Sequence, residues 1–177
     1  MRKHMAKSDS FFIRAKVRVS GVTYNQEEID LGSFVNLGVS KSTLLRIHNI
    51  QPQYTDAGDP STVIYYDGGI PGGKLTWQLT TQSQTELIEA SDKSFISGGS
   101  YNQASTTGNL VQPADETADM NVAEWRNGYL VGVDSLFLGA DSSVTWDNGD
   151  VAIAVVMECT LESATQASAT ALALSQQ

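Results

Sequence analysis

The side chains that could carry out catalysis are few in this chain, and their spacing matches no complete signature. The two histidines are His4 and His48, and neither has a second His or a Cys at a spacing that suits zinc. A Ser-His-acid triad would have to use His48, but the Gly-x-Ser-x-Gly turn that exposes a nucleophilic serine is missing. The single cysteine, Cys159, lies in an apolar run, which indicates a buried and inert thiol. We therefore expect no enzymatic activity and no cofactor.

A glycine-rich stretch at 68–75 comes close to a phosphate-binding loop. It reads Gly-Gly-Ile-Pro-Gly-Gly-Lys-Leu, so Leu75 stands where such a loop needs a Ser or Thr to hold magnesium. A strand pattern follows it, whereas a phosphate site of this kind needs the N-terminus of a helix. The glycines therefore predict a tight turn between strands.

Carboxylates near residue 150 suggest a calcium site. Asp147 and Glu158 are spaced like positions 1 and 12 of an EF-hand loop. Gly149 and Val151 then occupy positions 3 and 5, where side-chain oxygen ligands are needed, and this excludes an EF-hand. A single calcium ion shared by Asp147, Asp150 and another loop stays open as an alternative; otherwise we expect no metal.

Basic residues are concentrated at the start of the chain. Residues 1–18 hold six of the 11 Lys and Arg and one of the 20 Asp and Glu, so this segment carries about +5 and the remainder about −14. A basic arm on an acidic body can contact the phosphates of nucleic acid or of lipid headgroups. Arg2, Lys3 and Lys7 are the candidate contacts. The alternative is a short solvated tail with no binding role.

Two tryptophans are candidates for surface contacts. Trp125 and Trp146 lie near predicted loops, where an indole could stack on a sugar ring or contact another protein. Trp77 falls on the apolar face of a predicted strand and is expected in the core.

The elements that must position these residues read as strands. Apolar residues recur in short blocks between Gly, Ser, Thr and Asn, which is typical of an all-β sandwich or barrel, and 177 residues suit one domain with a sizeable core. No apolar run approaches the roughly 20 residues of a transmembrane helix. Strands are expected at 11–19, 29–37, 43–54, 62–66, 74–81, 94–97, 129–138 and 151–161.

The segment from Tyr129 to Leu161 is predicted to be central to the fold because it holds two apolar runs rich in β-branched residues. The pair Asn148-Gly149 between them suits a tight turn. The sequence therefore predicts two neighbouring antiparallel strands at the centre of one sheet.

Three other segments are polar or rich in small residues. Residues 83–90 start with a potential capping box and predict a short helix. Residues 97–119 hold almost no aliphatic side chains, which predicts an exposed functional or partner-binding loop, the alternative being a disordered insertion. Residues 163–177 could form a helix, an extended arm across a neighbour, or a loose tail.

The strand count defines the expected fold class. Seven or eight antiparallel strands with long loops predict an all-β sandwich, a jelly roll of about eight strands. An immunoglobulin-like sandwich is the nearest competitor, but the paired cysteines and the core tryptophan pattern are missing. We expect a basic N-terminal arm at 1–10, one sandwich domain at 11–162 and a small-residue tail at 163–177.

An all-β chain with a basic arm, long polar loops and a small-residue tail resembles the single jelly-roll capsid proteins of tailless icosahedral viruses of archaea and bacteria. The resemblance covers the whole chain through its strand count and the Tyr129–Leu161 segment, without a shared short motif. It implies a coat subunit of the virion, made in the host cytoplasm, that assembles with copies or relatives of itself into an icosahedral shell.

The resemblance also implies that the arm at residues 1–10 points inward, toward genome or membrane. The net charge of −9 departs from coats that package nucleic acid directly, which favours an internal membrane or a further protein layer. Two other functions stay open from the sequence: a carbohydrate-binding β-sandwich module, and a fibre or decoration protein of a tailed phage. The coat function needs other capsid subunits as partners and no small-molecule substrate.

Overall fold

The structure is a computed structural model that describes residues 9–69, 71–106, 109–110 and 115–177. Strands make up most of it. In chain order the elements are β1 (Phe11–Val19), β2 (Asn25–Asp30), β3 (Lys41–Asp56), β4 (Gly73–Thr80), β5 (Phe95–Gln103), β6 (Ser105–Thr106), β7 (Asn109–Leu110), β8 (Asp115–Met120), the 3-10 helix η1 (Val122–Glu124), β9 (Tyr129–Val131), β10 (Ser135–Ser142), β11 (Val151–Thr165) and α1 (Gln166–Ser175).

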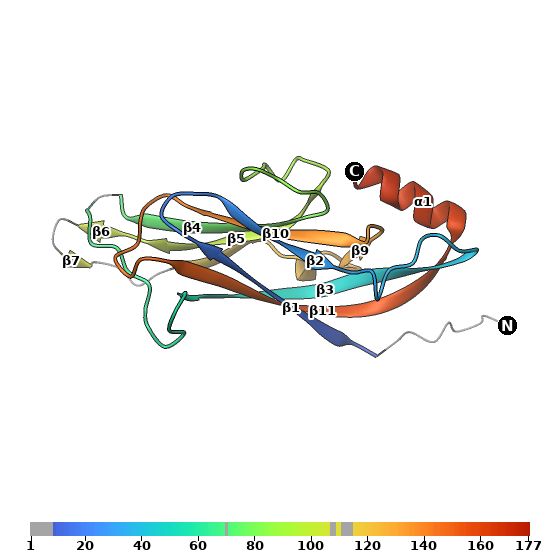
Figure 1. Ribbon diagram of the computed structural model, residues 1–177, viewed down its shortest axis with the longest axis horizontal. Helices are drawn as coiled ribbons and strands as arrows, with labels where there is room; N and C mark the ends of the chain where they lie inside the picture. The colour runs from blue at the N-terminus through green and yellow to red at the C-terminus, as the bar shows by residue number, and fades with distance from the viewer. Residues whose placement is uncertain (1–8, 70, 107–108, 111–114) are drawn as a thin grey trace.

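The long strands form two antiparallel sheets that pack face to face (Figure 1). One has the order β1-β11-β3-β9 and the other the order β2-β10-β4-β5-β8, while β6 and β7 pair separately. The pairs β1–β11, β2–β10, β3–β9 and β4–β5 are nested one inside another along the sequence. This nesting is the strand order of a jelly roll. The predicted all-β jelly roll is therefore confirmed.

The alternation in β1 shows how the sequence specifies a sandwich strand. Val17 and Val19 are 0% and 1% exposed and face the opposite sheet, whereas Arg14, Lys16 and Arg18 between and beside them face solvent. Successive side chains of a strand point to opposite faces, so one strand supplies both core and surface. The predicted strand at 11–19 is confirmed with these bounds.

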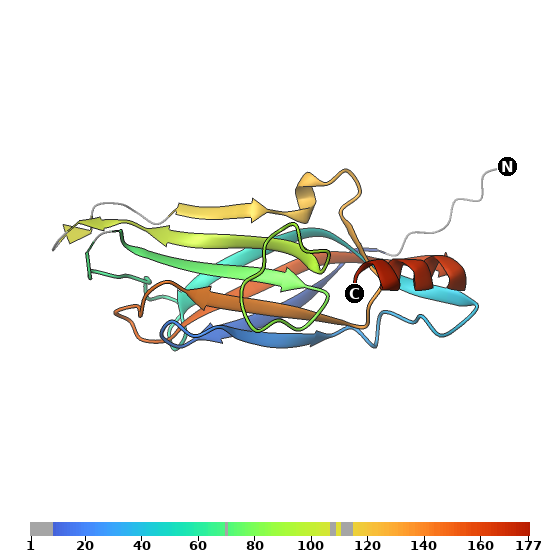
Figure 2. The ribbon, with the colours of Figure 1, turned by 90° about the horizontal axis from the view of Figure 1, so that it is seen from above.

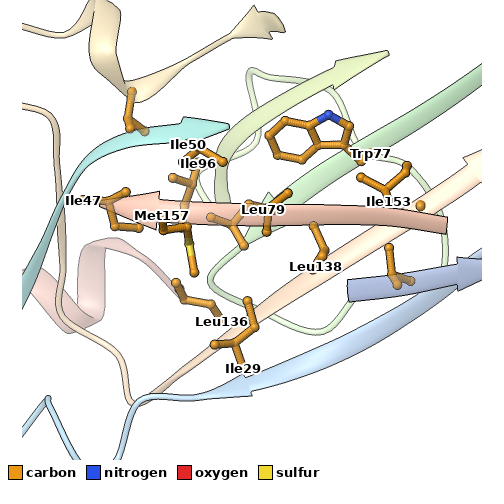
Figure 3. Close-up of a cluster of buried hydrophobic side chains, with 14 of the residues drawn as sticks. Ile29, Ile47, Ile50, Trp77, Leu79, Ile96, Leu136, Leu138, Ile153 and Met157 are labelled. Atoms are coloured by element: carbon orange, nitrogen blue, oxygen red, sulfur yellow. The ribbon is translucent and has the colours of Figure 1, made fainter. Parts of the chain in front are cut away.

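The core lies between the two sheets (Figure 3). Close-packed apolar side chains from both sheets meet there, and each contributes about 1.5–3 kcal/mol when fully buried. From the labelled cluster, Trp77, Leu79, Leu136, Leu138, Ile153 and Met157 are at most 2% exposed. The indole N–H of Trp77 donates to the Tyr54 hydroxyl at 2.9 Å, which satisfies the one polar group that this large side chain buries.

The predicted hairpin within Tyr129–Leu161 is wrong. Its first run is divided between β9 and β10, which belong to different sheets, and β10 and β11 do not pair with each other. β11 lies between β1 and β3, and β10 lies between β2 and β4, so the two strands face each other across the core. The Asn148-Gly149 turn is present, with Gly149 at φ 90°, but it leads from one sheet to the other. Two strands with apolar inner faces bury those faces best by lying opposite each other in the two sheets.

The predicted loop at 97–119 is also wrong. Residues 95–103 form β5, an interior strand between β4 and β8, and residues 115–120 form β8. Small side chains make this possible: a Cβ atom on Gly98 would lie 2.9 Å from the Trp77 carbonyl oxygen, so only glycine permits this approach. The Ser97 hydroxyl donates to the Met120 carbonyl, which satisfies the hydrogen-bonding need of this buried side chain. Such polar buried residues give no apolar pattern from which a strand could be predicted.

Three further elements differ from the sequence prediction. β2 spans Asn25–Asp30 instead of 29–37, and residues 62–66 form no strand although Ile64 is buried. No helix forms at 83–90. There the backbone is held by the Gln78 side chain, which donates to the Glu86 carbonyl at 2.9 Å and accepts from the Ile88 N–H at 2.8 Å. These bonds replace those of a helical turn.

The C-terminal segment forms a helix, one of the three predicted alternatives. β11 continues to Thr165, whose hydroxyl accepts from the Ser168 N–H at 3.2 Å and caps α1. Figure 1 places α1 at one end of the sandwich, opposite the small β6–β7 sheet. Of the helices in the described ranges, none has the length and apolar character that a bilayer span requires.

Candidate functional site

One side of the sandwich carries two charged strands with open edges, β1 and β2. Each is hydrogen-bonded to a neighbour on one side only, and β1 and β2 contact each other there. In Figure 2, β2 forms one side of its sheet and β8 the opposite side. We call the outward residues Arg14, Lys16, Arg18, Glu28 and Asp30 of these two strands the charged edge.

The basic half of the charged edge belongs to β1. Arg18 is paired: its guanidinium lies 2.6 Å from Asp150, and this hydrogen bond, with a second from Ser20, lowers the pKa of the Asp150 carboxyl. The Arg14 guanidinium lies 5.7 Å from the centre of the Phe12 ring, which is itself 54% exposed. Arg14 and Lys16 form no ion pair within the described ranges, so two cations face solvent unneutralised.

The acidic half belongs to β2. Its Ile29 enters the core, so Glu28 and Asp30 on either side point to the outer face. One oxygen of Glu28 accepts from the Ser135 hydroxyl at 2.6 Å, and one of Asp30 accepts from the Gly32 N–H at 2.7 Å. Each carboxylate has a second oxygen that can accept a further hydrogen bond. The same side of the molecule therefore presents both signs of charge on adjacent strands.

A second feature is a polar groove of about 550 Å³ on the outer face of β3 and β11, beside η1. We call it the polar groove, and it is lined by Arg46, His48, Ala123, Trp125, Arg126, Asn127, Gly128 and Glu162. Arg46 and His48 reach it because they alternate with the core residues Leu45 and Ile47.

Hydrogen bonds fix the floor of the polar groove. Arg46 binds both oxygens of Glu162, with Nη2–Oε2 at 2.8 Å, and also donates to the Asn127 carbonyl at 2.7 Å. The bond to Glu162 raises the pKa of the Arg46 guanidinium, which is permanently charged. His48 Nε2 is hydrogen-bonded to the Thr160 hydroxyl at 2.7 Å. The groove is therefore lined by polar groups that are already oriented.

The two tryptophans proposed as surface contacts differ. Trp125 is 50% exposed and lines the polar groove next to Arg126, which is exposed and has no ion-pair partner in the described ranges. The prediction that Trp146 lies at the surface is wrong, because it is 2% exposed. Its ring packs edge-on against Tyr101 and its N–H donates to the Ser142 hydroxyl at 2.8 Å. The polar residues around Trp146 in the sequence do not reveal that the loop that carries this side chain folds back over the core.

The other sequence-derived candidates take structural roles or lie elsewhere. Arg2, Lys3 and Lys7 of the basic arm lie outside the described residues. Asp150 binds Arg18, and Asp147 accepts from the Asp67 N–H at 2.8 Å. Within the described ranges no three acidic, His or Cys side chains gather as metal ligands would.

The glycines at 68–75 make a turn into β4, with Gly69 at φ 99° and Gly72 at φ 100°. Both angles lie in the left-handed region that favours glycine. Leu75 is fully buried in β4, which is why a strand follows these glycines. The sequence analysis did not identify the acidic half of the charged edge, because it predicted the second strand at 29–37 whereas β2 is Asn25–Asp30, which leaves Glu28 outside the predicted strand. The solvent-facing side of β1 was evident from its alternation.

Neither protein-family models nor curated protein sequences give a match to the chain. Solved structures do. VP1 of Trichodysplasia spinulosa-associated polyomavirus, in complex with sialylated precision glycooligomers, superposes with a TM-score of 0.49 at 8% identity, covering 86% of this chain and 94% of that chain.

Two further VP1 structures are similar to the same extent. Human Polyomavirus 12 VP1 with 3'-sialyllactosamine gives a TM-score of 0.49 at 8% identity, over 89% of this chain and 100% of that chain. Merkel cell polyomavirus VP1 with disialyllactose gives 0.47 at 8% identity, over 90% and 96%.

Proposed function

We propose that this chain is a viral coat subunit that assembles with copies or relatives of itself into an icosahedral shell. The observation that carries the proposal is the nested strand order of a jelly roll, an architecture shared by viral capsid and lectin domains. Its interior is filled by the packed side chains of the core, so functional groups are displayed on the outside.

The outside of the sandwich suits repeated association. β1 and β2 leave two open strand edges on one side, and Phe12 is exposed beside them. Open edges and exposed apolar side chains are features that a monomer usually covers or avoids. Closed symmetric assemblies gain stability by repeating modest contacts of this kind many times.

The finer proposal is a coat of a tailless icosahedral virus of archaea or bacteria. The acidic body argues against direct packaging of nucleic acid, and a basic arm at residues 1–10 would contact an internal membrane or another inner layer. The site of action would be the virion, with other capsid subunits as partners.

The test is assembly of the purified chain. Electron microscopy and sedimentation velocity at increasing protein concentration are expected to show regular capsomers, sheets or shells. A chain that stays monomeric at millimolar concentration, alone and with coat proteins expressed from the same genome, would contradict the coat function. Elongated trimers would instead support a fibre or decoration protein.

A second candidate function, carbohydrate binding, is favoured by the polar groove. A half-exposed indole beside oriented polar groups is the arrangement by which proteins stack and hydrogen-bond a sugar ring. The guanidinium of Arg126, which has no ion-pair partner among the described residues, would add preference for a sugar that carries a carboxylate.

A glycan array followed by titration calorimetry tests this second function. Trp125→Ala is expected to abolish binding of any glycan found, because the stacking surface is lost, while Trp146→Phe should leave binding unchanged. Equal binding by wild type and Trp125→Ala would rule out a sugar site in the polar groove.

A further inference from the structure

We propose that two copies of this chain join through the charged edge, with β1 of each copy beside β2 of the other, about a two-fold axis that runs parallel to the strands. The inference rests on the proposed coat function and specifies one of its assembly contacts. The occupant of the edge is thus a second copy of the chain itself.

The backbones of the two strands are free to pair. Among the described residues β1 pairs only with β11, and β2 only with β10. The Arg18 carbonyl at the end of β1 accepts from the Asn25 side chain at 2.8 Å, and the open sides of both strands otherwise have no strand neighbour. Such edges accept another extended chain readily. The nine residues of β1 are enough to pair with all six residues of β2.

The outward side chains then match in sign. When two sheets join edge to edge, the outward residues of both strands lie on one continuous surface, where directly opposite residues interact. Arg14 and Lys16 of one copy lie opposite Glu28 and Asp30 of the other, and both groups project from alternate strand positions. Arg18 takes little part because Asp150 already neutralises it.

The charges also select the symmetry axis. A two-fold axis parallel to the strands places the four-stranded sheet of one copy beside the five-stranded sheet of the other, so a basic strand meets an acidic strand twice. A two-fold axis perpendicular to the sheets would place β1 beside β1 and β2 beside β2, with like charges opposed at both contacts. Opposed like charges disfavour that arrangement.

Charged edge strands also protect monomers from aggregation, but that role needs only one sign of charge. A single sign on both strands would repel every copy. Opposite signs on β1 and β2 instead make the edge complementary to itself. The arrangement of charge therefore fits pairing better than protection.

Charge reversal in two separate variants tests the inference. Arg14→Glu/Lys16→Glu opposes acids to acids, and Glu28→Lys/Asp30→Lys opposes bases to bases, so each is expected to raise the Kd of self-association by about 100-fold. Mixing the two variants, or combining all four substitutions in one chain, restores opposite charges and is expected to restore association. The fourfold variant should not associate with wild type. Sedimentation velocity and native mass spectrometry measure these states.

Lys41→Glu/Lys93→Glu is the matched control for Arg14→Glu/Lys16→Glu, since it makes the same change in net charge at two exposed lysines outside the charged edge and should leave association intact. Circular dichroism checks folding, and Arg14→Gln/Lys16→Gln, expected to weaken association less, serves if a reversal unfolds the chain. Wild type that assembles, but whose edge reversals assemble equally well, overturns the charged-edge pairing alone. Wild type that never assembles overturns the coat function as well.

Discussion

At the scale of single residues, the surroundings of a side chain decide its role more than its type does. Trp125 and Trp146 occur in similar polar stretches, yet one lines the polar groove and the other lies in the core. The sequence could identify both as unusual. It could not separate them, because burial of Trp146 depends on Tyr101, which is 45 positions away in the chain.

Trp146→Ala should destabilise the protein by about 3–5 kcal/mol, because it leaves a large cavity and removes the hydrogen bond from the indole N–H to the Ser142 hydroxyl. Trp125→Ala is the control and should change the free energy of unfolding by less than about 0.5 kcal/mol, because its ring is half exposed. Urea denaturation followed by circular dichroism measures both. Equal losses would contradict the placement of Trp146 in the core.

Cys159 should be unreactive in the native state. Burial, assisted by the nearby Glu158 carboxylate, raises the pKa of the Cys159 thiol to about 12, and only the thiolate is nucleophilic. Iodoacetamide at pH 8 is expected to label the chain in urea but not in buffer, as read by mass spectrometry. Rapid labelling of folded protein would contradict this.

The same shift has a definite sign in stability. The folded thiol holds its proton more tightly than the unfolded thiol, whose pKa is about 8.5. Its contribution to stability is thus complete below pH 8.5 and is lost as the pH rises toward 12. Cys159→Ala should remove this component of the alkaline decline, as urea midpoints at pH 8 and pH 10 would reveal.

At the scale of elements, the alternation of apolar and polar residues predicted strands reliably, whereas the apolar content of a segment did not. The strands at 11–19 and 74–81 were found by period-two patterns, and the structure has them at Phe11–Val19 and Gly73–Thr80. Only the start of β5 was predicted, as a strand at 94–97, because the burial of the rest depends on glycines and serines that admit close neighbours and not on large apolar side chains. A strand of this kind is recognisable only with its neighbours in place.

Gln176 holds α1 against the sandwich. Its side chain accepts from the Gly132 N–H at 2.8 Å and donates to the Leu130 carbonyl at 2.7 Å, and the residue is 5% exposed. Gln176→Ala leaves those two backbone groups without partners and should cost about 1–3 kcal/mol. Hydrogen exchange should then show faster exchange in α1. Ser175→Ala, at an exposed neighbour, is the control and should leave α1 protected.

At the scale of the whole molecule, the jelly roll could be predicted from strand count, but the pairing of its strands could not. Two apolar runs joined by a turn fit a hairpin as well as a crossing between sheets. The nested order β1–β11, β2–β10, β3–β9, β4–β5 decides in favour of the crossing. The charged edge likewise needs the fold, since Lys16 and Glu28 share one side of the molecule only through this order.

Deletion of residues 2–10 should leave the fold and its thermal midpoint unchanged but weaken binding to vesicles of anionic lipid. The deleted segment carries three of the chain's basic residues, Arg2, Lys3 and Lys7, and one acid. Binding of the full chain should fall as salt rises. Vesicle co-sedimentation from 50 to 500 mM salt measures this, and equal binding of both forms would contradict a lipid-contacting arm.

The unequal exposure of the three tryptophans gives this protein built-in optical reporters. Trp77 and Trp146 are each 2% exposed and should emit at short wavelength, shielded from iodide, whereas Trp125 at 50% should emit at longer wavelength and be quenched. A glycan bound in the polar groove would shift the emission of Trp125 to shorter wavelength and protect it from iodide. Pairing through the charged edge, which includes none of the residues that line the polar groove, would leave the Trp125 emission unchanged. One fluorimeter experiment without any dye can therefore tell the two events apart.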